Sequence, residues 1–332
     1  MQSGNKVAVI GGGSWATAIV KILSNNCDQI SWWLRSDDAV NFILKHKHNP
    51  AYLTDVEIDV TKVRPSTSLH DVVSDASLVI LAVPSAFLKS VLKDTDEKLF
   101  KDKIIFSAIK GIVPDDLLIV GEFIHRRLNV PIRQIGVLTG PCHAEEVALE
   151  KLSYLTVACQ ETSHAALLSG LLNCRYIRAT VSDDIYGTEY SAVIKNIIAI
   201  ASGICNGLGY GDNFQAVLIS NSIQEIKRFL DAVSPITRDI NDSAYLGDLL
   251  VTAYSQFSRN RTFGAMIGKG YSVKSAQLEM NMIAEGYYAV KCIYELNKKY
   301  NVDLPVCNAV YKILYEHISP RTEMKQLSDR MK

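Results

Sequence analysis

The segment VAVIGGGSWATAIVKIL, residues 7–23, decides the fold of this 332-residue chain. It reads as a short apolar strand, a turn built on Gly11, Gly12 and Gly13, and the start of a helix. In the spacing G-x-G-x-x-A, Gly11 permits a sharp turn, Gly13 lets the backbone approach a pyrophosphate, and Ala16 lets the helix pack on the strand. The free N–H groups of that helix would hold the phosphates. A glycine-rich turn that binds no phosphate has a similar sequence, so the residues that flank the motif must distinguish the two.

The next apolar run favours a dinucleotide-binding fold. It covers residues 30–34 and ends at Arg35, about twenty residues after the glycines, where a contact with the adenosine ribose is expected. A guanidinium at this position can pair with a 2′-phosphate. We therefore expect NAD or NADP as the cofactor, with NADPH accepted at least as well as NADH.

The order of apolar patterns predicts two domains. Strand-like runs lie at 78–83, 104–107, 135–138, 154–157 and 176–178, with helical patterns between several of them, such as 86–99 and 115–128. After about residue 185 the helical segments are 187–205, 213–231, 244–257, 273–298 and 303–317. Apolar strands alternating with helices indicate a mostly parallel sheet covered on both faces. We predict an α/β fold, with a doubly wound, Rossmann-type dinucleotide-binding domain over 1–185 and an all-helical substrate and catalytic domain over 186–332.

Composition argues against several other classes of protein. Thirty-five basic residues balance thirty-five acidic ones, and no basic run suggests a nucleic-acid partner. The seven cysteines are scattered without a CxxC pair, which indicates neither disulfides nor zinc, and no set of potential ligands has the spacing of a metal site. The most hydrophobic stretch, residues 197–205, is too short to span a membrane, and no apolar leader precedes the first strand. We expect a soluble cytoplasmic protein.

Lys195 stands out among the candidate catalytic residues. It is the one charged residue in residues 192–200, which are otherwise almost entirely apolar and predicted to be helical. A buried charge costs free energy unless it is paired or used. Desolvation lowers the pKa of a lysine, which lets it act as a general acid and base near neutral pH. The alternative is a structural lysine whose ammonium reaches the surface.

Three further features suit a polar substrate. Asp248 and Thr252 are four residues apart and share one face of a helix, although Asp248 could equally be an N-cap after Gly247. Residues 258–261, Ser-Arg-Asn-Arg, gather two guanidinium groups in one turn and suit a phosphate or carboxylate, with a solvated basic turn as the alternative. Lys110 follows a predicted strand end, where open α/β sheets bind ligands.

Eight motifs follow one another between residues 11 and 261: GGGSWATA at 11–18, AVPS at 82–85, SAIKGI at 107–112, GPCHAEE at 140–146, KNIIAIASGI at 195–204, GDN at 211–213, GDLLVT at 247–252 and SRNR at 258–261. Together they resemble the NAD(P)-dependent glycerol-3-phosphate dehydrogenases of bacterial type. The resemblance implies hydride transfer between NAD(P)H and dihydroxyacetone phosphate, giving sn-glycerol 3-phosphate for glycerophospholipid synthesis.

The resemblance also implies roles for individual residues. Lys195 would exchange the proton, and Lys110 and Asp248 would position the substrate and the lysine. Arg259 and Asn260 would take the substrate phosphate and neighbouring cofactor groups. The implied substrate-binding residues are Lys110, Gly140, Cys142, Lys195, Asn196, Asp248, Thr252, Ser258, Arg259 and Asn260. The implied cofactor-binding residues are Gly11, Gly13, Ser14, Trp15, Arg35, Lys110, Ala144, Arg259, Ile283 and Glu285.

Three positions depart from the pattern of the family. Ala16 stands where glycine is frequent, Cys142 where serine is usual, and residues 190–192, Tyr-Ser-Ala, where two glycines usually precede the lysine helix. Alanine is compatible with close helix packing. Cys142 removes a hydroxyl near the expected substrate, and residues 190–192 add bulk where the helix is expected to approach the cofactor domain. Turnover and cofactor preference are therefore the properties in which this protein could differ from the family.

Two other functions compete with this interpretation. A dehydrogenase of the same two-domain plan could act on a hydroxy acid or a sugar acid and direct guanidinium groups at a carboxylate. A nicotinamide-sensing protein without catalysis would use the cofactor to drive domain closure, but Lys195, Asp248 and Arg259 argue against it. The oligomeric state is left open by the sequence, a homodimer included.

Overall fold

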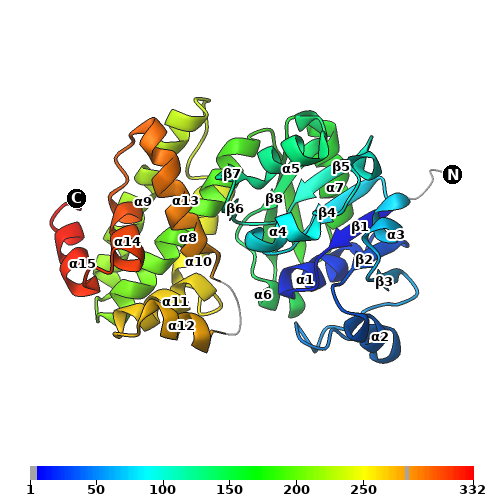
Figure 1. Ribbon diagram of the computed structural model, residues 1–332, viewed down its shortest axis with the longest axis horizontal. Coiled ribbons are helices and arrows are strands. Elements are labelled where there is room, and N and C mark those ends of the chain that lie inside the picture. Colours follow the sequence, from blue (N-terminus) through cyan, green and yellow to red (C-terminus); the bar gives the residue numbers. More distant parts are fainter. Residues whose placement is uncertain (1–5, 281–283) are drawn as a thin grey trace. The chain divides into compact units, whose positions relative to one another are not determined.

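The structure is a computed structural model that describes residues 6–280 and 284–332 (Figure 1). The chain divides into two compact units. The first, the sheet unit, comprises Met1–Ile109 and Val120–Ile185. The second, the helical unit, comprises Lys110–Ile119 and Tyr186–Lys332.

The sheet unit is built on one eight-stranded sheet of the order β3-β2-β1-β4-β5-β8-β9-β10. Every neighbouring pair is parallel except β8 and β9. The order runs outward in both directions from β1 and β4, which is the doubly wound arrangement that the sequence predicts. The strands are β1 (Val7–Ile10), β2 (Ile30–Trp33), β3 (Val63–Ser66), β4 (Leu78–Leu81), β5 (Ile104–Ser107), β8 (Ile135–Thr139), β9 (Ser153–Cys159) and β10 (Ile177–Ser182).

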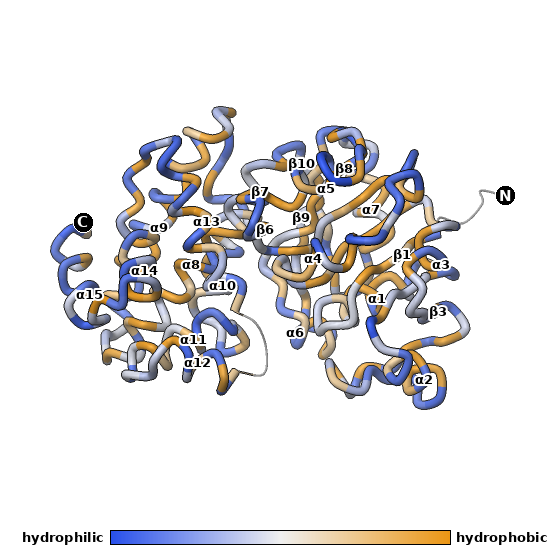
Figure 2. The backbone as a smooth tube through the Cα atoms, viewed as in Figure 1, coloured by the Kyte–Doolittle hydropathy of each residue, from blue (hydrophilic) through white to orange (hydrophobic). Residues whose placement is uncertain are grey.

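The core of the sheet unit explains why these segments form strands. β1 and β4 are buried along their whole length, because both faces of a parallel sheet are covered. Figure 2 shows these central strands mostly in the colours of hydrophobic residues. The sequence did not indicate β3, which contains Arg64 and Pro65. It lies at the edge of the sheet, where a proline costs no ladder hydrogen bond.

The helices of the sheet unit are shorter than the sequence patterns suggest. The pattern at 86–99 is divided into α4 and the 3₁₀ turn η1, and the pattern at 115–128 contains a short strand before α5 begins. The helices are α1 (Ser14–Leu23), α2 (Asp37–His46), α3 (Leu69–Ser74), α4 (Ser85–Val91), α5 (Val120–Leu128), α6 (Ala144–Ala148) and α7 (Thr162–Leu172), with η1 (Glu97–Phe100) and η2 (Ile132–Gln134).

The helical unit contains only helices from Tyr186 onward, as far as the structure describes the chain. It also takes in a two-stranded antiparallel hairpin, β6 (Ile112–Val113) and β7 (Leu118–Ile119), from a stretch that the sequence analysis places with the first domain. The helices are α8 (Ile185–Gly207), α9 (Asp212–Val233), the π-helical turn η3 (Ser243–Gly247), α10 (Asp248–Tyr254), α11 (Arg259–Gly268), α12 (Val273–Glu279), α13 (Glu285–Tyr300), α14 (Pro305–Tyr315) and α15 (Pro320–Ser328).

The structure adds one helix and divides another. No helix was predicted over 258–268, but Arg259 begins α11, because Ser258 is the N-cap and its Oγ accepts a hydrogen bond from the N–H of Arg261. The predicted helix at 273–298 is divided, since α12 ends at Glu279 and α13 begins at Glu285.

Helix α8 forms the centre of the helical unit and is buried on all sides along its middle. Its backbone contacts that of α11, because a Cβ atom at Gly264 would lie 2.1 Å from the carbonyl oxygen of Ile200. Only glycine permits this approach. The contact holds the helix that carries Lys195 against the helix that begins with Arg259.

Candidate active site

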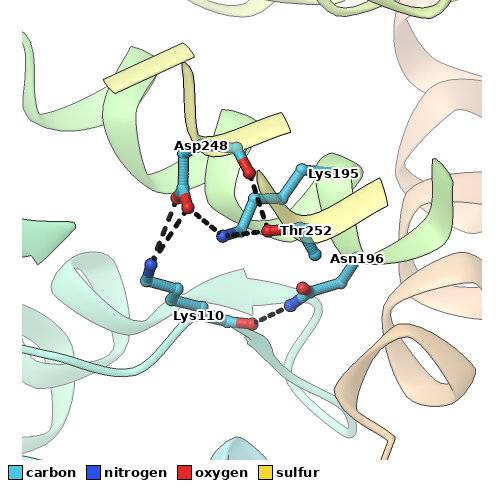
Figure 3. A network of polar contacts seen from close by, with 5 residues as sticks. All are labelled: Lys110, Lys195, Asn196, Asp248 and Thr252. Carbon is cyan, nitrogen blue, oxygen red and sulfur yellow. Dashed lines mark hydrogen bonds and ion pairs between the residues drawn. The ribbon is translucent and has the colours of Figure 1, made fainter. Parts of the chain in front are cut away.

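Lys195 is a buried lysine with two polar partners. It lies in α8 with 3% of its surface exposed, and its Nζ donates to the Asp248 carboxylate and, at 2.9 Å, to Thr252 Oγ1 (Figure 3). The ammonium therefore does not reach the surface, which excludes the alternative of a lysine whose ammonium lies in solvent. The partners come from α10, whose residues 248 and 252 lie one helical turn apart.

Asp248 is shared between two lysines. It is the first residue of α10 and is 1% exposed, and its carboxylate accepts from Lys195 and, at 3.2 and 3.3 Å, from Lys110 Nζ. No side-chain cap hydrogen bond holds the start of α10, so the N-cap interpretation of Asp248 is wrong. The Thr252 hydroxyl donates to the Asp248 carbonyl oxygen at 2.7 Å, which leaves its lone pairs to accept from Lys195.

Asn196 fixes the backbone of Lys110. Its Nδ2 donates to the Lys110 carbonyl oxygen at 2.7 Å, as Figure 3 shows. Both ends of Lys110 are thus tied to helices of its own unit, the backbone to α8 through Asn196 and the ammonium to α10 through Asp248. Five of the residues predicted from sequence, Lys110, Lys195, Asn196, Asp248 and Thr252, are brought together in this network.

Burial and charge together set the protonation of this network. Burial lowers the pKa of Lys195 from 10.5 to about 7, the attraction of Asp248 opposes that change, and the like charge of Lys110 adds to it. For Asp248, burial alone would raise the pKa, but the ammonium groups of Lys110 and Lys195 hold it below its ordinary value. Two cations and one anion leave a net positive charge when both lysines are protonated. Such a group can donate a proton to a substrate oxygen and stabilise negative charge there.

The start of α11 offers groups for an anion. The Arg259 guanidinium is partly exposed and forms no hydrogen bond or ion pair with any residue that the structure describes. Asn260 is buried, and its Oδ1 accepts from the N–H of Gly286 at 2.9 Å. A helix N-terminus and a guanidinium both favour a negatively charged group.

Gly286 is a residue that sequence reasoning missed. It follows Glu285 in the first turn of α13, and a Cβ atom there would lie 2.6 Å from the carbonyl oxygen of Asn196. The N–H of Gly286 holds the Asn260 side chain, so three helices meet at this point. A backbone N–H leaves no side-chain signal in a sequence. Of the predicted residues nearby, Glu285 begins α13, and Ile283 lies outside the described residues.

The glycine turn of the sheet unit fits a dinucleotide phosphate. Gly11 has φ +138°, and a Cβ atom there would lie 2.3 Å from the Ala82 carbonyl oxygen, so only glycine can occupy this position. Gly13 is the N-cap of α1 and has no side chain with which to cap it, which leaves the first N–H groups of α1 available. Trp15 Nε1 is buried without a partner among the described residues. A helix N-terminus with free N–H groups beside a close glycine turn suits a bound pyrophosphate.

The other residues predicted to contact the cofactor or substrate lie along the same sheet. The Gly11 N–H donates to the Trp33 carbonyl oxygen at 3.1 Å, which brings the end of β2 next to the glycine turn. Arg35 is exposed just after β2, and Ser14 is buried in the first turn of α1. Gly140, Cys142 and Ala144 follow β8 and lead into α6, so they belong to the sheet unit and not to the unit that carries Lys195.

The departures from the family pattern are accommodated by packing. Ala16 is fully buried in α1, and Cys142 is buried between β8 and α6. Tyr190 packs edge-on against Phe229 of α9, with ring centroids 5.5 Å apart, inside the core of the helical unit. The added bulk at this position is therefore absorbed by that core.

The described part of the chain contains no group of three or more His, Cys, Asp or Glu residues that could hold a metal ion. None of its helices combines the length and the apolar character needed to cross a bilayer.

A dinucleotide-type sheet unit followed by a helical unit with a buried lysine–carboxylate pair defines the class of two-domain nicotinamide-dependent dehydrogenases. Family models agree: residues 6–165 match the N-terminus and residues 184–325 the C-terminus of NAD-dependent glycerol-3-phosphate dehydrogenase. The chain belongs to the NAD-dependent glycerol-3-phosphate dehydrogenase family. This confirms the resemblance, the fold class and the prediction of an NAD(P)-dependent oxidoreductase.

Individual relatives extend over nearly the whole chain. The glycerol-3-phosphate dehydrogenase [NAD(P)+] of Staphylococcus aureus strain JH9 is 34% identical over 328 residues, 98% of each chain. The crystal structure of glycerol-3-phosphate dehydrogenase from Coxiella burnetii has a TM-score of 0.91 at 27% identity and covers 98% of this chain and 99% of its own. The structure from Plasmodium falciparum has a TM-score of 0.86 at 24% identity, covers 97% and 94%, and supports the fold.

Proposed function

We propose that this protein interconverts dihydroxyacetone phosphate and sn-glycerol 3-phosphate, with Lys195 as the residue that exchanges the proton. The observation that carries this proposal is the buried Lys195 ammonium held between Asp248 and Thr252. When NAD(P)H is bound, its nicotinamide supplies the hydride that reaches C2 of the ketone. In that direction the Lys195 ammonium protonates the carbonyl oxygen, and in the reverse direction the amine accepts the hydroxyl proton.

The neighbouring residues hold the proton donor and stabilise charge. Asp248 and Thr252 orient the Lys195 ammonium through their hydrogen bonds, so that its third N–H is left for the substrate oxygen. Lys110 keeps Asp248 ionised and adds positive charge where the substrate oxygen becomes an alkoxide. Asn196 holds Lys110 in place for both tasks.

The substrate phosphate is assigned to the start of α11. Arg259 presents a guanidinium without an internal partner among the described residues, and Asn260 is oriented by Gly286 so that its amide N–H groups remain available. Ser258 caps the helix with its hydroxyl. A guanidinium fork beside a helix N-terminus matches the charge and geometry of a phosphate.

The cofactor is assigned to the sheet unit, with residues 1–185 as the dinucleotide-binding domain and 186–332 as the substrate and catalytic domain. Gly11, Gly13 and the first turn of α1 would take the pyrophosphate, and Arg35 would face the adenosine ribose. The product, glycerol 3-phosphate, would supply the backbone of glycerophospholipids.

The proposal includes a cytoplasmic location and assembly as a homodimer. All seven cysteines are free thiols, and six of them are buried, which is typical of proteins from reducing compartments such as the cytoplasm. A homodimer is the assembly to test, by light scattering of the purified protein.

A substrate comparison tests the proposed reaction. Addition of dihydroxyacetone phosphate to the protein and NADH or NADPH should give steady oxidation of the reduced cofactor, and addition of pyruvate should give none. Oxidation with pyruvate or another keto acid would favour the hydroxy-acid dehydrogenase. Cofactor binding without turnover of any ketone would favour the nicotinamide-sensing protein.

A further inference from the structure

A second set of buried hydrogen bonds links α8 to α10, separate from the contacts of Lys195. Ser202 lies in α8 seven residues after Lys195, is 1% exposed, and its Oγ donates to the Ala253 carbonyl oxygen at 2.7 Å. Gln215, near the start of α9, donates from its Nε2 to the same Ser202 Oγ. Three helices are therefore joined through one buried hydroxyl.

The direction of these hydrogen bonds is fixed by chemistry. The Ala253 carbonyl oxygen can only accept, so the single hydroxyl proton of Ser202 must point toward it. Ser202 Oγ is then left as an acceptor, and the Gln215 side chain must present its NH₂ group. Ala253 is among the last residues of α10, whose carbonyl groups have no partner within the helix, so Ser202 caps the end of α10.

Helix α10 depends on such outside contacts for its position. It has only seven residues, too few for a stable isolated helix, and it follows the π-helical turn η3. Near its start and middle, Asp248 and Thr252 are held by Lys195, and at its end Ala253 is held by Ser202. The two attachments to α8 together set where α10 lies along that helix.

We propose that Ser202 and Gln215 are positioning residues for the Lys195–Asp248 pair, because they hold the end of α10 at a fixed place on α8. Neither residue is expected to touch substrate or cofactor. They act through Ala253 on the placement of the Asp248 carboxylate and the Thr252 hydroxyl. The inference rests on the proposed role of Lys195 in proton exchange.

One variant removes the Ser202 hydroxyl, and a second changes which group accepts its proton. Ser202→Ala removes the donor to Ala253, and Gln215→Glu turns a donor into an acceptor that competes with Ala253 for the Ser202 proton. Both should lower kcat for reduction of dihydroxyacetone phosphate about tenfold. Gln215→Met keeps the length of the side chain and removes only the hydrogen bond to Ser202, while Ser202 still donates to Ala253, so kcat should fall less, by about threefold. KM for the substrate should stay within about twofold in all three, since the start of α11 is not altered.

The pH profile distinguishes positioning from general packing. The parent should lose kcat for reduction as pH rises through about 7, where the pKa of Lys195 lies. With Asp248 held less closely, Ser202→Ala should move this midpoint to lower pH, because the attraction of Asp248 is what raises it. Gln215→Glu adds a negative charge of its own, which opposes such a move, so kcat is the readout for that variant. A mutation that merely loosened the core would reduce the melting temperature and leave the midpoint unchanged.

Ser222→Ala is the matched control. Ser222 is a fully buried serine of α9 whose Oγ has no partner among the described residues, so kcat and the midpoint should not change. The inference is overturned if Ser202→Ala keeps the parent's kcat and midpoint, if Gln215→Glu keeps the parent's kcat, or if Ser222→Ala reproduces the losses. If Ser202→Ala does not fold, the two variants of the partly exposed Gln215 decide. A parent without turnover would instead overturn the proposed function, and this inference with it.

Discussion

Two fully buried carboxylates in the helical unit, Asp248 and Glu225, are neutralised in different ways. Asp248 is held by the ammonium groups of Lys110 and Lys195, and its pKa is lowered. Glu225, in α9, accepts from the backbone N–H groups of Val306 at 2.8 Å and Cys307 at 2.9 Å, at the start of α14. Burial raises the pKa of Glu225 to about 7, although both N–H groups oppose the change.

The difference shows that the partner of a buried carboxylate, more than its burial, decides what it can do. Backbone dipoles stabilise the charge of Glu225 only in part, so it serves as an internal cap that joins α9 to α14. Full positive charges hold Asp248 ionised, which keeps the exchangeable proton on Lys195. The start of α11 shows a third arrangement, a cation without an internal partner. No carboxylate among the described residues bonds to Arg259, so its guanidinium is available to bind an anion of a ligand.

The largest effect is expected from removing the proton donor. Lys195→Met keeps the length and apolar character of the side chain, and Lys110 still pairs with Asp248, so the variant should stay folded and bind NAD(P)H. Its kcat should fall by roughly two to four orders of magnitude, the usual contribution of a general acid and base. Lys298→Met, which removes an exposed lysine paired with Glu295, is the control and should leave kcat unchanged. Turnover of Lys195→Met within a few-fold of the parent would make Lys110 the next candidate for the proton donor.

The next largest effect is expected from removing the guanidinium that is proposed to bind the substrate phosphate at the start of α11. Arg259→Ala should lower kcat/KM for dihydroxyacetone phosphate roughly 100-fold, because a hydrogen bond to a charged group is worth about 1.5–3 kcal/mol. Arg259→Lys should recover only part of this, since the bidentate fork is lost. Steady-state kinetics with unphosphorylated dihydroxyacetone, a poor substrate, supply the comparison and should be much less affected. Equal proportional losses for both substrates would show that Arg259 serves the cofactor or the fold instead.

For Glu225, the second buried carboxylate of the comparison, the expected effect is on the free energy of unfolding. Its pKa is about 7 in the folded protein and about 4.5 unfolded, so the folded state binds the proton more tightly. The free energy of unfolding should therefore fall as pH rises from about 4.5 through 7, by about 3 kcal/mol in total. Glu225→Gln cannot ionise and should lack this contribution, while its kcat at pH 7 stays within a few-fold of the parent.

Denaturant unfolding of the parent and Glu225→Gln between pH 5 and 8 measures that contribution. The difference in free energy of unfolding, parent minus variant, should decrease steadily over this range. Parallel pH dependences in the two proteins would mean that the N–H groups of Val306 and Cys307 compensate the buried charge fully.

The contrast between Asp248 and Glu225 also marks the limit of what the sequence could predict. Lys195 was recognisable because a charge interrupts an apolar helix, and its carboxylate partner lies on a helix with a visible motif. Glu225 lies in an ordinary mixed helix, and its partners are backbone N–H groups about eighty residues away. Backbone partners have no side-chain signature, and the same reason concealed Gly286.

The fold shows the same division between local and tertiary signals. The central strands were predicted because their own residues are apolar, whereas β3 was missed because an edge strand tolerates Arg64 and Pro65. Helix α11 was missed because its polar start and its Gly264 weaken the local helical pattern. The contact with α8 is what requires that glycine, and a single helix does not reveal its neighbour.

The smallest expected effect concerns the 2′-phosphate of the cofactor, an anion at an exposed site. Arg35 is solvent-exposed after β2, so its pairing with a 2′-phosphate should be screened and worth about 1 kcal/mol or less. NADPH should be accepted at least as well as NADH, and Arg35→Ala should lower kcat/KM for NADPH about two- to fivefold while leaving that for NADH unchanged. Arg64→Ala, which removes another exposed arginine at the same edge of the sheet, should change neither value. A strong preference of the parent for NADH would show that the Arg35 guanidinium points away from the ribose.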